Sequence, residues 1–244
     1  MINVAVLGAA GRMGTAVTRA IESAEGLSLV AALEADDALA LAGATVAVDF
    51  TAPSATEANV HALIDARVHA VVGTSGWTDE ALTRVREHLA AAPGVGVLIA
   101  PNFALSAVLS MRFAAMAAPY FESVEIVELH HPDKVDAPSG TALHTAKGVA
   151  AARAAKGVGP SPDATTQDPD GARGAVIEGI HVHAVRLRGL VAHEEVLLGN
   201  PGEQLTIRTD SFDRASFMPG VLLGIREVAA HPGLTVGLDG YLSL

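Results

Sequence analysis

Ile2-Asn-Val-Ala-Val-Leu-Gly-Ala-Ala-Gly-Arg-Met-Gly14 decides the fold, because this stretch joins an apolar strand to a glycine-rich turn at the start of a helix. The helical run behind the turn places apolar residues at Ala16, Val17, Ala20, Ile21 and Ala24. The glycines allow backbone N–H groups to approach a pyrophosphate, and the helix start favours its charge. The spacing is G-x-x-G-x-x-G rather than G-x-G-x-x-G, so its position after the first strand carries more weight than the pattern.

A second strand is expected over Leu27–Leu33, and it ends at Glu34. This glutamate follows Gly14 by about twenty residues, the usual spacing for a carboxylate that binds the adenosine ribose. Such a carboxylate repels a 2′-phosphate, and the next residue is Ala35 where an NADP-selective protein could carry Arg. The sequence therefore predicts a preference for NADH, although Arg12 in the glycine turn leaves NADPH possible.

Strands and helices then alternate, which predicts a parallel sheet with its ligands beyond the carboxyl ends of the strands. The expected elements are strand Val46–Phe50, helix Ser54–Ala66, strand Val68–Gly73, helix Asp79–Ala91 and strand Gly94–Ala100. Small or amide-bearing residues follow three of these strands, where a nicotinamide and its riboses would lie. Together with the glycine turn and Glu34 they make the predicted cofactor site: Gly8, Ala9, Ala10, Gly11, Arg12, Met13, Gly14, Glu34, Phe50, Thr51, Gly73, Thr74, Ser75, Ala100, Pro101, Asn102 and Phe103.

Composition excludes several classes of function. The chain has 244 residues, a formal net charge of −11 and no cysteine. The acidic balance argues against nucleic acid or an anionic membrane surface as a partner, and the lack of cysteine removes thiolate nucleophiles and cysteine-based metal sites. Met1 leads directly into the first strand without a signal-peptide pattern, so we expect a cytoplasmic protein.

A second domain is expected where the alternation of strands and helices ends. It would follow a helix over Ala104–Pro119, and three strand candidates joined by short turns suggest an antiparallel meander: Ile180–Leu187, Leu190–Leu198 and Gln204–Asp210. A helix over Arg214–His231 and a strand over Leu234–Leu238 would return to the first domain. The expected fold is α/β, with a Rossmann-type dinucleotide-binding domain (1–104 and 214–244) and a smaller α+β substrate-binding domain (105–213) that has a mostly antiparallel open sheet.

The segment from Val124 to Thr141 combines two histidines, a lysine and the start of a helix. Alternation over Val124–Leu129 predicts a strand that places His130 on the face of Glu128 and His131 on the other. A helix opens at Pro138-Ser-Gly-Thr141, and its unpaired N–H groups can hold a carboxylate or phosphate. With His131 and Lys134 beside it, the segment is typical of an anion pocket that also carries a proton donor.

The segment Glu125-Ile-Val-Glu-Leu-His130, followed by Lys134-Val-Asp-Ala-Pro-Ser-Gly-Thr-Ala142, closely resembles the signature of the 4-hydroxy-tetrahydrodipicolinate reductase family, also called dihydrodipicolinate reductase. The glycine turn, Asp49-Phe-Thr51, Gly73-Thr74 and Pro101-Asn-Phe103 match the family at their expected places, so the resemblance covers essentially the whole chain. It implies an NAD(P)H-dependent reduction that yields tetrahydrodipicolinate with loss of water, in diaminopimelate and lysine biosynthesis. It also implies a homotetramer built through the sheets of the second domain.

The resemblance assigns roles residue by residue. His130 would be the catalytic acid/base or electrostatic stabiliser, and Lys134 the general acid. The carboxylates of a small dicarboxylate substrate would be bound by His131, Lys134, Ser139, Gly140 and Thr141. Hydride addition must be matched by a proton, and a desolvated lysine can have its pKa lowered toward the working range. Whether Lys134 or His130 supplies the proton stays open at this point.

The sequence can also be compared with the patterns of other kinds of protein. A metalloenzyme is suggested by ten histidines, including His181-x-His183 and His193, but the helical H-E-x-x-H motif is missing and we expect no functional metal. A Tyr-x-x-x-Lys dyad is absent, since Tyr120 and Tyr241 have no lysine four residues on. A non-catalytic NAD-binding redox sensor would have no use for the His130 and Lys134 segment, and a reductase of another small dicarboxylate remains the nearest alternative.

Overall fold

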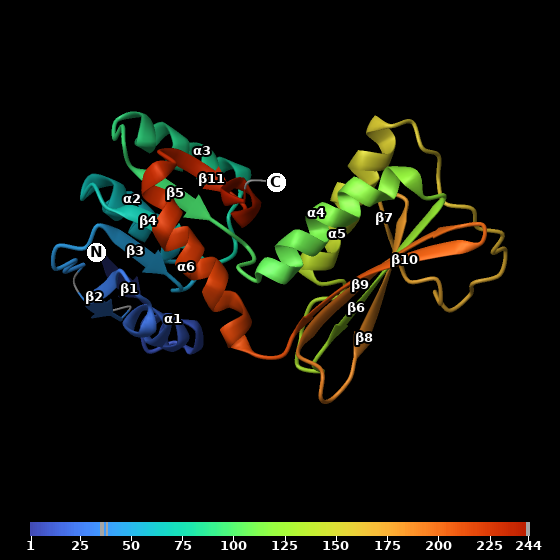
Figure 1. Ribbon diagram of the computed structural model, residues 1–244, viewed down its shortest axis with the longest axis horizontal. Coiled ribbons are helices and arrows are strands. Elements are labelled where there is room, and N and C mark those ends of the chain that lie inside the picture. The colour runs from blue at the N-terminus through green and yellow to red at the C-terminus, as the bar shows by residue number, and fades with distance from the viewer. Residues whose placement is uncertain (35–36, 38, 243–244) are drawn as a thin grey trace. The chain divides into compact units, whose positions relative to one another are not determined.

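The computed structural model describes residues 1–34, 37 and 39–242, and the chain forms two compact units (Figure 1). The first unit combines Met1–Leu105 with Arg214–Leu244, and the second contains Ser106–Asp213. Each unit has its own sheet and its own hydrophobic core.

The first unit is built on a parallel sheet of six strands in the order β11-β5-β4-β3-β1-β2. The strands are β1 (Ile2–Leu7), β2 (Leu27–Leu33), β3 (Val46–Asp49), β4 (His69–Val72), β5 (Gly96–Ile99) and β11 (Gly233–Val236). Val46–Asp49 and Val72 are buried, as expected for a parallel sheet that is covered on both faces. The predicted parallel sheet is thereby confirmed.

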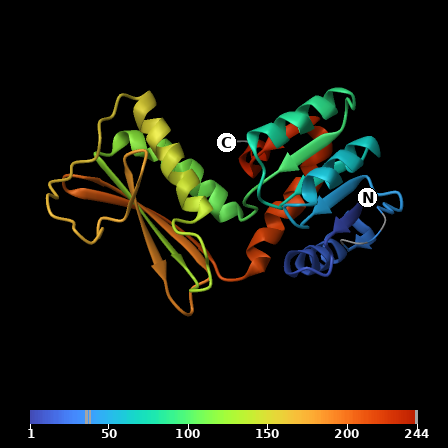
Figure 2. The same ribbon diagram turned by 180° about the vertical axis from the view of Figure 1, so that it is seen from behind.

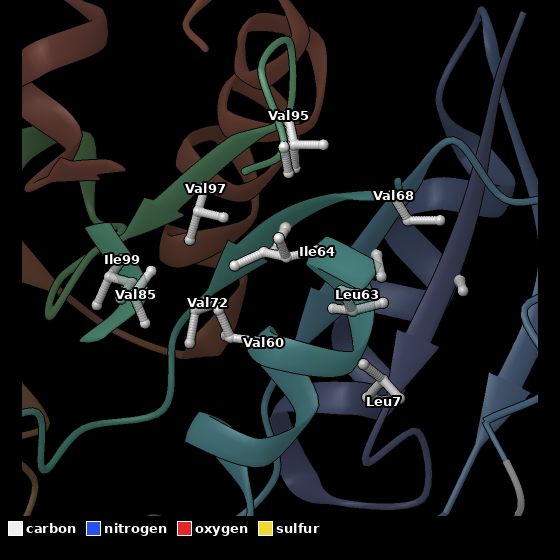
Figure 3. Close-up of a cluster of buried hydrophobic side chains, with 14 of the residues drawn as sticks. Leu7, Val60, Leu63, Ile64, Val68, Val72, Val85, Val95, Val97 and Ile99 are labelled. Carbon is white, nitrogen blue, oxygen red and sulfur yellow. The ribbon is translucent and has the colours of Figure 1, made fainter. Parts of the chain in front are cut away.

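Helices cover both faces of this sheet (Figures 1 and 2). They are α1 (Arg12–Ser23), α2 (Thr56–Asp65), α3 (Asp79–Ala90) and α6 (Met218–Glu227), with short 3-10 turns η2 (Arg214–Phe217), η3 (Val228–Ala230) and η4 (Leu238–Tyr241). Figure 3 shows the core beneath α2 and α3, where Val60, Leu63 and Ile64 meet apolar side chains of β1, β4 and β5. On the opposite face, Gly224 of α6 lies against Leu98 and Val71.

The strand order determines where a ligand can bind. From β1 the chain first moves to β2 on one side and then returns to β3 on the other, so the switch point lies between β1 and β3. Ligands of open α/β sheets bind beyond the carboxyl ends of the strands at such a point. In this chain the glycine turn follows β1 there, and Phe50 and Thr51 follow β3.

The second unit has a five-stranded sheet in the order β10-β9-β6-β8-β7. Its elements are α4 (Leu105–Ala117), η1 (Ala118–Tyr120), β6 (Ser123–His130), α5 (Gly140–Ala155), β7 (Ala175–Ile177), β8 (Ile180–Arg186), β9 (Ala192–Asn200) and β10 (Glu203–Ser211). Val124, Ile126 and Val196 of the sheet are packed with Ala142 and Ala146 of α5 in one core. The helices lie on one face of the sheet, as Figures 1 and 2 show.

Three details differ from the sequence-based expectation. The sheet is mostly antiparallel as predicted, and β9 pairs with β10, but the meander is wrong at β8, because β6 lies between β8 and β9 and pairs with β8 in parallel. β7 (Ala175–Ile177) was not expected from the sequence. The helix predicted over Arg214–His231 is divided into η2, α6 and η3, with Pro219 in the first turn of α6.

None of the helices in the described part of the chain has both the length and the apolar character that a membrane crossing needs.

Candidate functional site

The glycine turn closes tightly between β1 and α1. Gly8 has a positive φ of 77°, and its N–H donates to the carbonyl of Leu33 at 2.8 Å. A Cβ at Gly14 would lie 2.0 Å from the Gly8 carbonyl oxygen, so only glycine allows the first turn of α1 to approach this closely. Gly11 is the N-cap of α1 and provides no side-chain cap, and the first turn carries no acidic residue. The start of α1 therefore has N–H groups without a side-chain cap, which suits the phosphates of a dinucleotide.

Glu34 lies at the carboxyl end of β2, beside this turn. Its Oε1 accepts the backbone N–H of Ala10 at 2.5 Å, and its own N–H donates to Asp37 at 2.8 Å. Glu34 and Ala10 are both exposed. The structure thus brings the carboxylate to the turn, whereas Ala35 lies outside the described residues.

Asp49 ties together the strand ends that follow β3 and β4. Its buried carboxylate accepts hydrogen bonds from the Thr51 N–H at 2.8 Å, the Thr51 hydroxyl at 2.7 Å and the Thr74 hydroxyl at 3.1 Å. Asn59 of α2 donates to the other carboxylate oxygen at 2.9 Å. Asp49 was not among the predicted site residues, although it orients two that were.

Phe50 joins these strand ends to the segment after β5. Its ring lies so close to Gly73 that a Cβ there would meet a ring atom at 2.0 Å, and its centroid is 5.8 Å from that of Phe103. Ala100 and Phe103 are buried, whereas Ser75 and Pro101 are exposed. The Asn102 side-chain oxygen accepts the N–H of Ala104 at 2.8 Å, which shapes the start of α4. The predicted cofactor-binding residues of the three strand ends therefore lie around one packed edge of the sheet.

Glu128 is the centre of the second cluster, in the other unit. It is fully buried on β6, and four donors from three elements bind its carboxylate. Arg186 of β8 donates to both oxygens at 2.7 and 2.8 Å, and the N–H of Ser139 donates to Oε1 at 3.0 Å. Burial alone would raise the pKa of Glu128, but the hydrogen bonds from Arg186 and His130 outweigh burial and lower the pKa. The carboxylate is therefore ionised at neutral pH.

His130 is oriented by this carboxylate. Its Nδ1 lies 2.6 Å from Glu128 Oε2, which confirms that the two side chains share a strand face. Because an ionised carboxylate can only accept, Nδ1 carries the hydrogen and Nε2 is left to act as an acceptor in the neutral ring. Burial lowers the pKa of His130, and the positive charges of Lys134 and Arg186 act in the same direction.

The predicted anion-binding residues follow in the loop and at the start of α5. His131 is exposed, and Lys134 Nζ donates to Asp136 at 2.6 Å. This contact lowers the pKa of Asp136. Ser139 is buried and caps α5, because its hydroxyl oxygen accepts the N–H of Ala142 at 3.2 Å. Gly140 and Thr141 form the first turn of that helix, which confirms the predicted helix start.

Two residues that organise this cluster, Glu128 and Arg186, were missed as site residues. Arg186 is 58 positions from Glu128 and also donates to the carbonyl of Asp136 at 2.7 Å, so it links the sheet to the Lys134 loop. The sequence feature that could have indicated these residues is Glu128 itself, a charged residue at a core-facing position of a strand. Such a residue needs a cationic partner when it is buried.

The histidines that suggested a metal are bound to protein groups. His183 Nε2 lies 2.8 Å from Glu125, and His181 Nδ1 lies 2.8 Å from the carbonyl oxygen of Arg173. His193 Nδ1 lies 2.6 Å from Asp210. Over residues 1–34, 37 and 39–242, no three His, Asp or Glu side chains are grouped as metal ligands would be.

Comparison with known proteins gives a consistent result over the full length. The family described as "Dihydrodipicolinate reductase, N-terminus" matches residues 2–103, and "Dihydrodipicolinate reductase, C-terminus" matches residues 106–242. The 4-hydroxy-tetrahydrodipicolinate reductase of Beutenbergia cavernae is 69% identical, with 100% of this chain and 99% of that protein covered. The protein of the same name from Streptomyces coelicolor is 59% identical, with 100% and 98% covered.

A solved structure agrees with these sequence matches. The dipicolinate-bound dihydrodipicolinate reductase from Paenisporosarcina sp. TG-14 superposes with a TM-score of 0.89 at 34% identity, covering 99% of this chain and 100% of that one. With two family matches that together span nearly the whole sequence, the chain belongs to the dihydrodipicolinate reductase family.

Proposed function

We propose that this protein reduces 4-hydroxy-tetrahydrodipicolinate to tetrahydrodipicolinate with NAD(P)H, and that water is lost in the process. The reaction belongs to diaminopimelate and lysine biosynthesis. The observation that carries the proposal is the cluster around Glu128, which fixes His130, Arg186 and the start of α5 around one buried carboxylate. We also propose that the protein works in the cytoplasm, where reduced nicotinamide cofactors are regenerated.

The first unit would hold the cofactor, which supplies the hydride when bound. The uncapped start of α1 behind the glycine turn suits its pyrophosphate. The residues after β3, β4 and β5 would surround the nicotinamide and its riboses: Phe50, Thr51, Gly73, Thr74, Ser75, Ala100, Pro101, Asn102 and Phe103. The network around Asp49 keeps Thr51 and Thr74 in fixed orientations for this purpose.

Glu34 would bind the hydroxyls of the adenosine ribose, and we propose that NADH is at least as good a hydride donor for this protein as NADPH. Its carboxylate already lies at the glycine turn through the bond with Ala10. In that position it can accept hydrogen bonds from ribose hydroxyls, whereas a 2′-phosphate would meet its negative charge. Arg12 at the start of α1 is exposed and leaves NADPH usable.

The second unit would hold the substrate. Each of the two carboxylates on a small ring needs a positively polarised group of the protein in a fixed position. The start of α5, with Ser139, Gly140 and Thr141, offers one such group. His131 and Lys134 would supply the others from the loop between β6 and α5. Arg186 is committed to Glu128 and to the carbonyl of Asp136, so its role is to hold this loop rather than to bind substrate.

The geometry favours Lys134 as the proton donor. Hydride addition leaves electron density on the substrate, and one proton must follow for the product to be neutral at that atom. His130 is neutral with its hydrogen held at Nδ1 by Glu128, so Nε2 has a lone pair and no proton to give. A lysine ammonium has three hydrogens, and Lys134 needs only to leave Asp136 to direct one toward substrate. His130 would then orient the substrate by accepting a hydrogen bond.

A homotetramer assembled through the second sheet is part of the same proposal. The helices α4 and α5 cover one face of that sheet, and the face that carries Glu125, His183 and Arg208 is left for another copy. Sedimentation velocity on the purified protein tests this directly. A monomer at micromolar concentration would contradict it.

The experiment for the reaction follows NADH absorbance after addition of freshly made product of dihydrodipicolinate synthase, with NADPH in parallel. Pyridine-2,6-dicarboxylate is added as a planar competitor. Rapid turnover that this competitor blocks is the expected result. Binding of NADH without turnover would contradict the proposal and leave an NAD-binding sensor or a reductase of another dicarboxylate.

A further inference from the structure

Glu194 is a second buried glutamate in the substrate-binding unit. It lies on β9 with 3% of its surface exposed, directly opposite Glu128 of β6 in the antiparallel pair. Glu128 has Arg186 and His130 as partners. Among the described residues, Glu194 Oε1 is hydrogen-bonded only to the hydroxyl of Thr145, and Oε2 has no hydrogen-bond partner. A buried carboxylate without a cation is costly unless it is protonated.

The surroundings of Glu194 contain no compensating charge among the described residues. Thr145 faces it from α5, and Glu128 is its neighbour on β6. On β10 its neighbour is Thr209, whose hydroxyl is bonded to Ser106 of α4 at 2.8 Å. The adjacent side chains of His193 and Glu195 point to the opposite face of the sheet, where they contact Asp210 and Arg208.

The number of hydrogens distinguishes the neutral form of Glu194 from the ionised form. The Thr145 hydroxyl oxygen lies 3.0 Å from the carbonyl oxygen of Thr141 and 2.7 Å from Glu194 Oε1. A hydroxyl has one hydrogen, so it cannot donate to both oxygens. If Thr145 donates to Thr141, the hydrogen in the shorter contact comes from Glu194. With Glu194 neutral, both contacts are hydrogen bonds, in a chain from Glu194 through Thr145 to Thr141 in the first turn of α5. With Glu194 ionised, only one of the two contacts can be a hydrogen bond.

The electrostatic surroundings agree with this count. Burial raises the pKa of Glu194 to about 7, and the negative charge of Glu128 acts in the same direction. A hydrogen bond donated by Thr145 to the ionised form of Glu194 opposes both effects and lowers the pKa. The neutral form is thus available within the physiological range of pH, and so is the ionised form.

We propose that Glu194, as a neutral carboxylic acid, is a positioning residue for the substrate site: through Thr145 it holds the first turn of α5, and loss of its proton weakens dicarboxylate binding. This inference rests on the proposed function, because it assigns the start of α5 to a substrate carboxylate. Glu194 itself does not touch the substrate in this scheme.

Ionisation acts in two ways. The proton leaves to solvent, and Thr145 must then turn its hydrogen toward Glu194, which releases the carbonyl of Thr141. A second negative charge also appears beside Glu128 in a poorly solvated environment, where charges interact strongly. Both changes disfavour an anion at the start of α5.

The test is calorimetric titration of the full-length protein with pyridine-2,6-dicarboxylate between pH 6 and pH 8.5, in the presence of saturating NADH. This probe stays doubly ionised throughout that range. Between pH 6 and pH 8.5 the wild type should lose affinity for this probe, and Glu194→Gln should lose roughly tenfold less. A tenfold effect is a usual size for coupling between two sites. Glutamine mimics the neutral acid, since its amide can donate to Thr145. Glu122→Gln is the control and keeps the wild-type slope, because Glu122 is an exposed glutamate of the same unit that lies outside the sheet.

A second pair of variants tests the link itself. Thr145→Val removes the hydroxyl and should weaken binding already at pH 6, with little further dependence on Glu194, whereas Thr145→Ser should retain the wild-type behaviour. Parallel pH curves for wild type and Glu194→Gln would overturn this inference alone. Absence of probe binding by the wild type at every pH would contradict the proposed function and this inference with it.

Discussion

His130 and Glu128 project from the same face of β6, and His130 Nδ1 lies 2.6 Å from Glu128 Oε2. The carboxylate is fully buried and also binds both terminal nitrogens of Arg186. One buried charge therefore sets the tautomer of the histidine and anchors β6 to β8. Three consequences of this cluster and its unit, and one of the glycine turn in the other unit, can be measured.

Glu128→Gln should lower turnover by roughly 10²-fold, the size expected when a reacting group is misplaced. The amide cannot neutralise Arg186, and it no longer forces the hydrogen of His130 onto Nδ1. The free energy of unfolding should fall by about 3 kcal/mol, since a buried ion pair loses one partner. Steady-state kinetics and urea unfolding measure the two effects.

Glu122→Gln is the control, because Glu122 lies just before the same strand but is exposed. Turnover of this variant should stay near the wild-type value. Equal losses for both variants would show that the buried position of Glu128 has no special role.

Lys134→Met should lower kcat by ~10²- to 10⁴-fold, the usual contribution of a general acid, while NADH binding stays nearly unchanged. Methionine keeps much of the side-chain volume and removes the only hydrogens that the scheme gives to the substrate. Stopped-flow reduction and fluorescence titration with NADH separate the two quantities. Lys147→Met changes an exposed lysine of α5 and should be silent. Near-normal turnover of Lys134→Met would remove this lysine from the mechanism.

Glu34→Ala should weaken NADH binding more than NADPH binding, because the lost carboxylate serves the ribose hydroxyls of NADH and opposes the 2′-phosphate of NADPH. Dissociation constants for both cofactors are measured by fluorescence. Glu22→Ala alters an exposed glutamate of α1 and should change neither constant. Equal losses for the two cofactors in Glu34→Ala would show that Glu34 does not read the ribose.

Glu194→Gln should gain stability relative to the wild type as the pH rises. The pKa of Glu194 is raised from 4.5 to about 7 in the folded protein, so the folded state holds the proton more tightly than the unfolded chain. The wild type therefore loses stability between pH 4.5 and pH 7, and little more above that. Glutamine does not titrate, so its advantage should grow by about 3 kcal/mol across this interval. Urea unfolding at several pH values gives the difference, and a constant difference between pH 4.5 and pH 8 would contradict the raised pKa.

Local patterns were enough to predict most elements of the fold. The alternation that ends at His130, the glycine turn after Leu7 and the helix start at Pro138-Ser-Gly-Thr141 each depend on neighbours in the sequence, and the structure has all three. The position of β6 between β8 and β9 could not be read in the same way. That pairing is decided by packing between distant segments, and a turn-rich connection favours a meander when only the sequence is considered.

The same limit applies to the candidate site, where the distance in sequence between partners decides what can be predicted. Residues grouped within one motif, such as Lys134 and Ser139, could be named from the sequence. Arg186 and Glu194 could not, because their partners Glu128 and Thr145 lie 58 and 49 positions away. A buried charge shows that a partner must exist, but only the register of the sheet identifies it.

The last segment of the chain, from Arg214, belongs to the same unit as the first 105 residues, and β11 forms an edge of the parallel sheet beside β5. During synthesis the ribosome therefore releases five strands of this sheet long before the sixth. Until Gly233–Val236 emerges, β5 presents a row of unpaired backbone groups, and unpaired strand edges are prone to association with other chains. The second unit is meanwhile complete in sequence and can fold first. We therefore expect the nascent chain to be most prone to aggregation and to chaperone binding after β5 has been released and before β11 emerges.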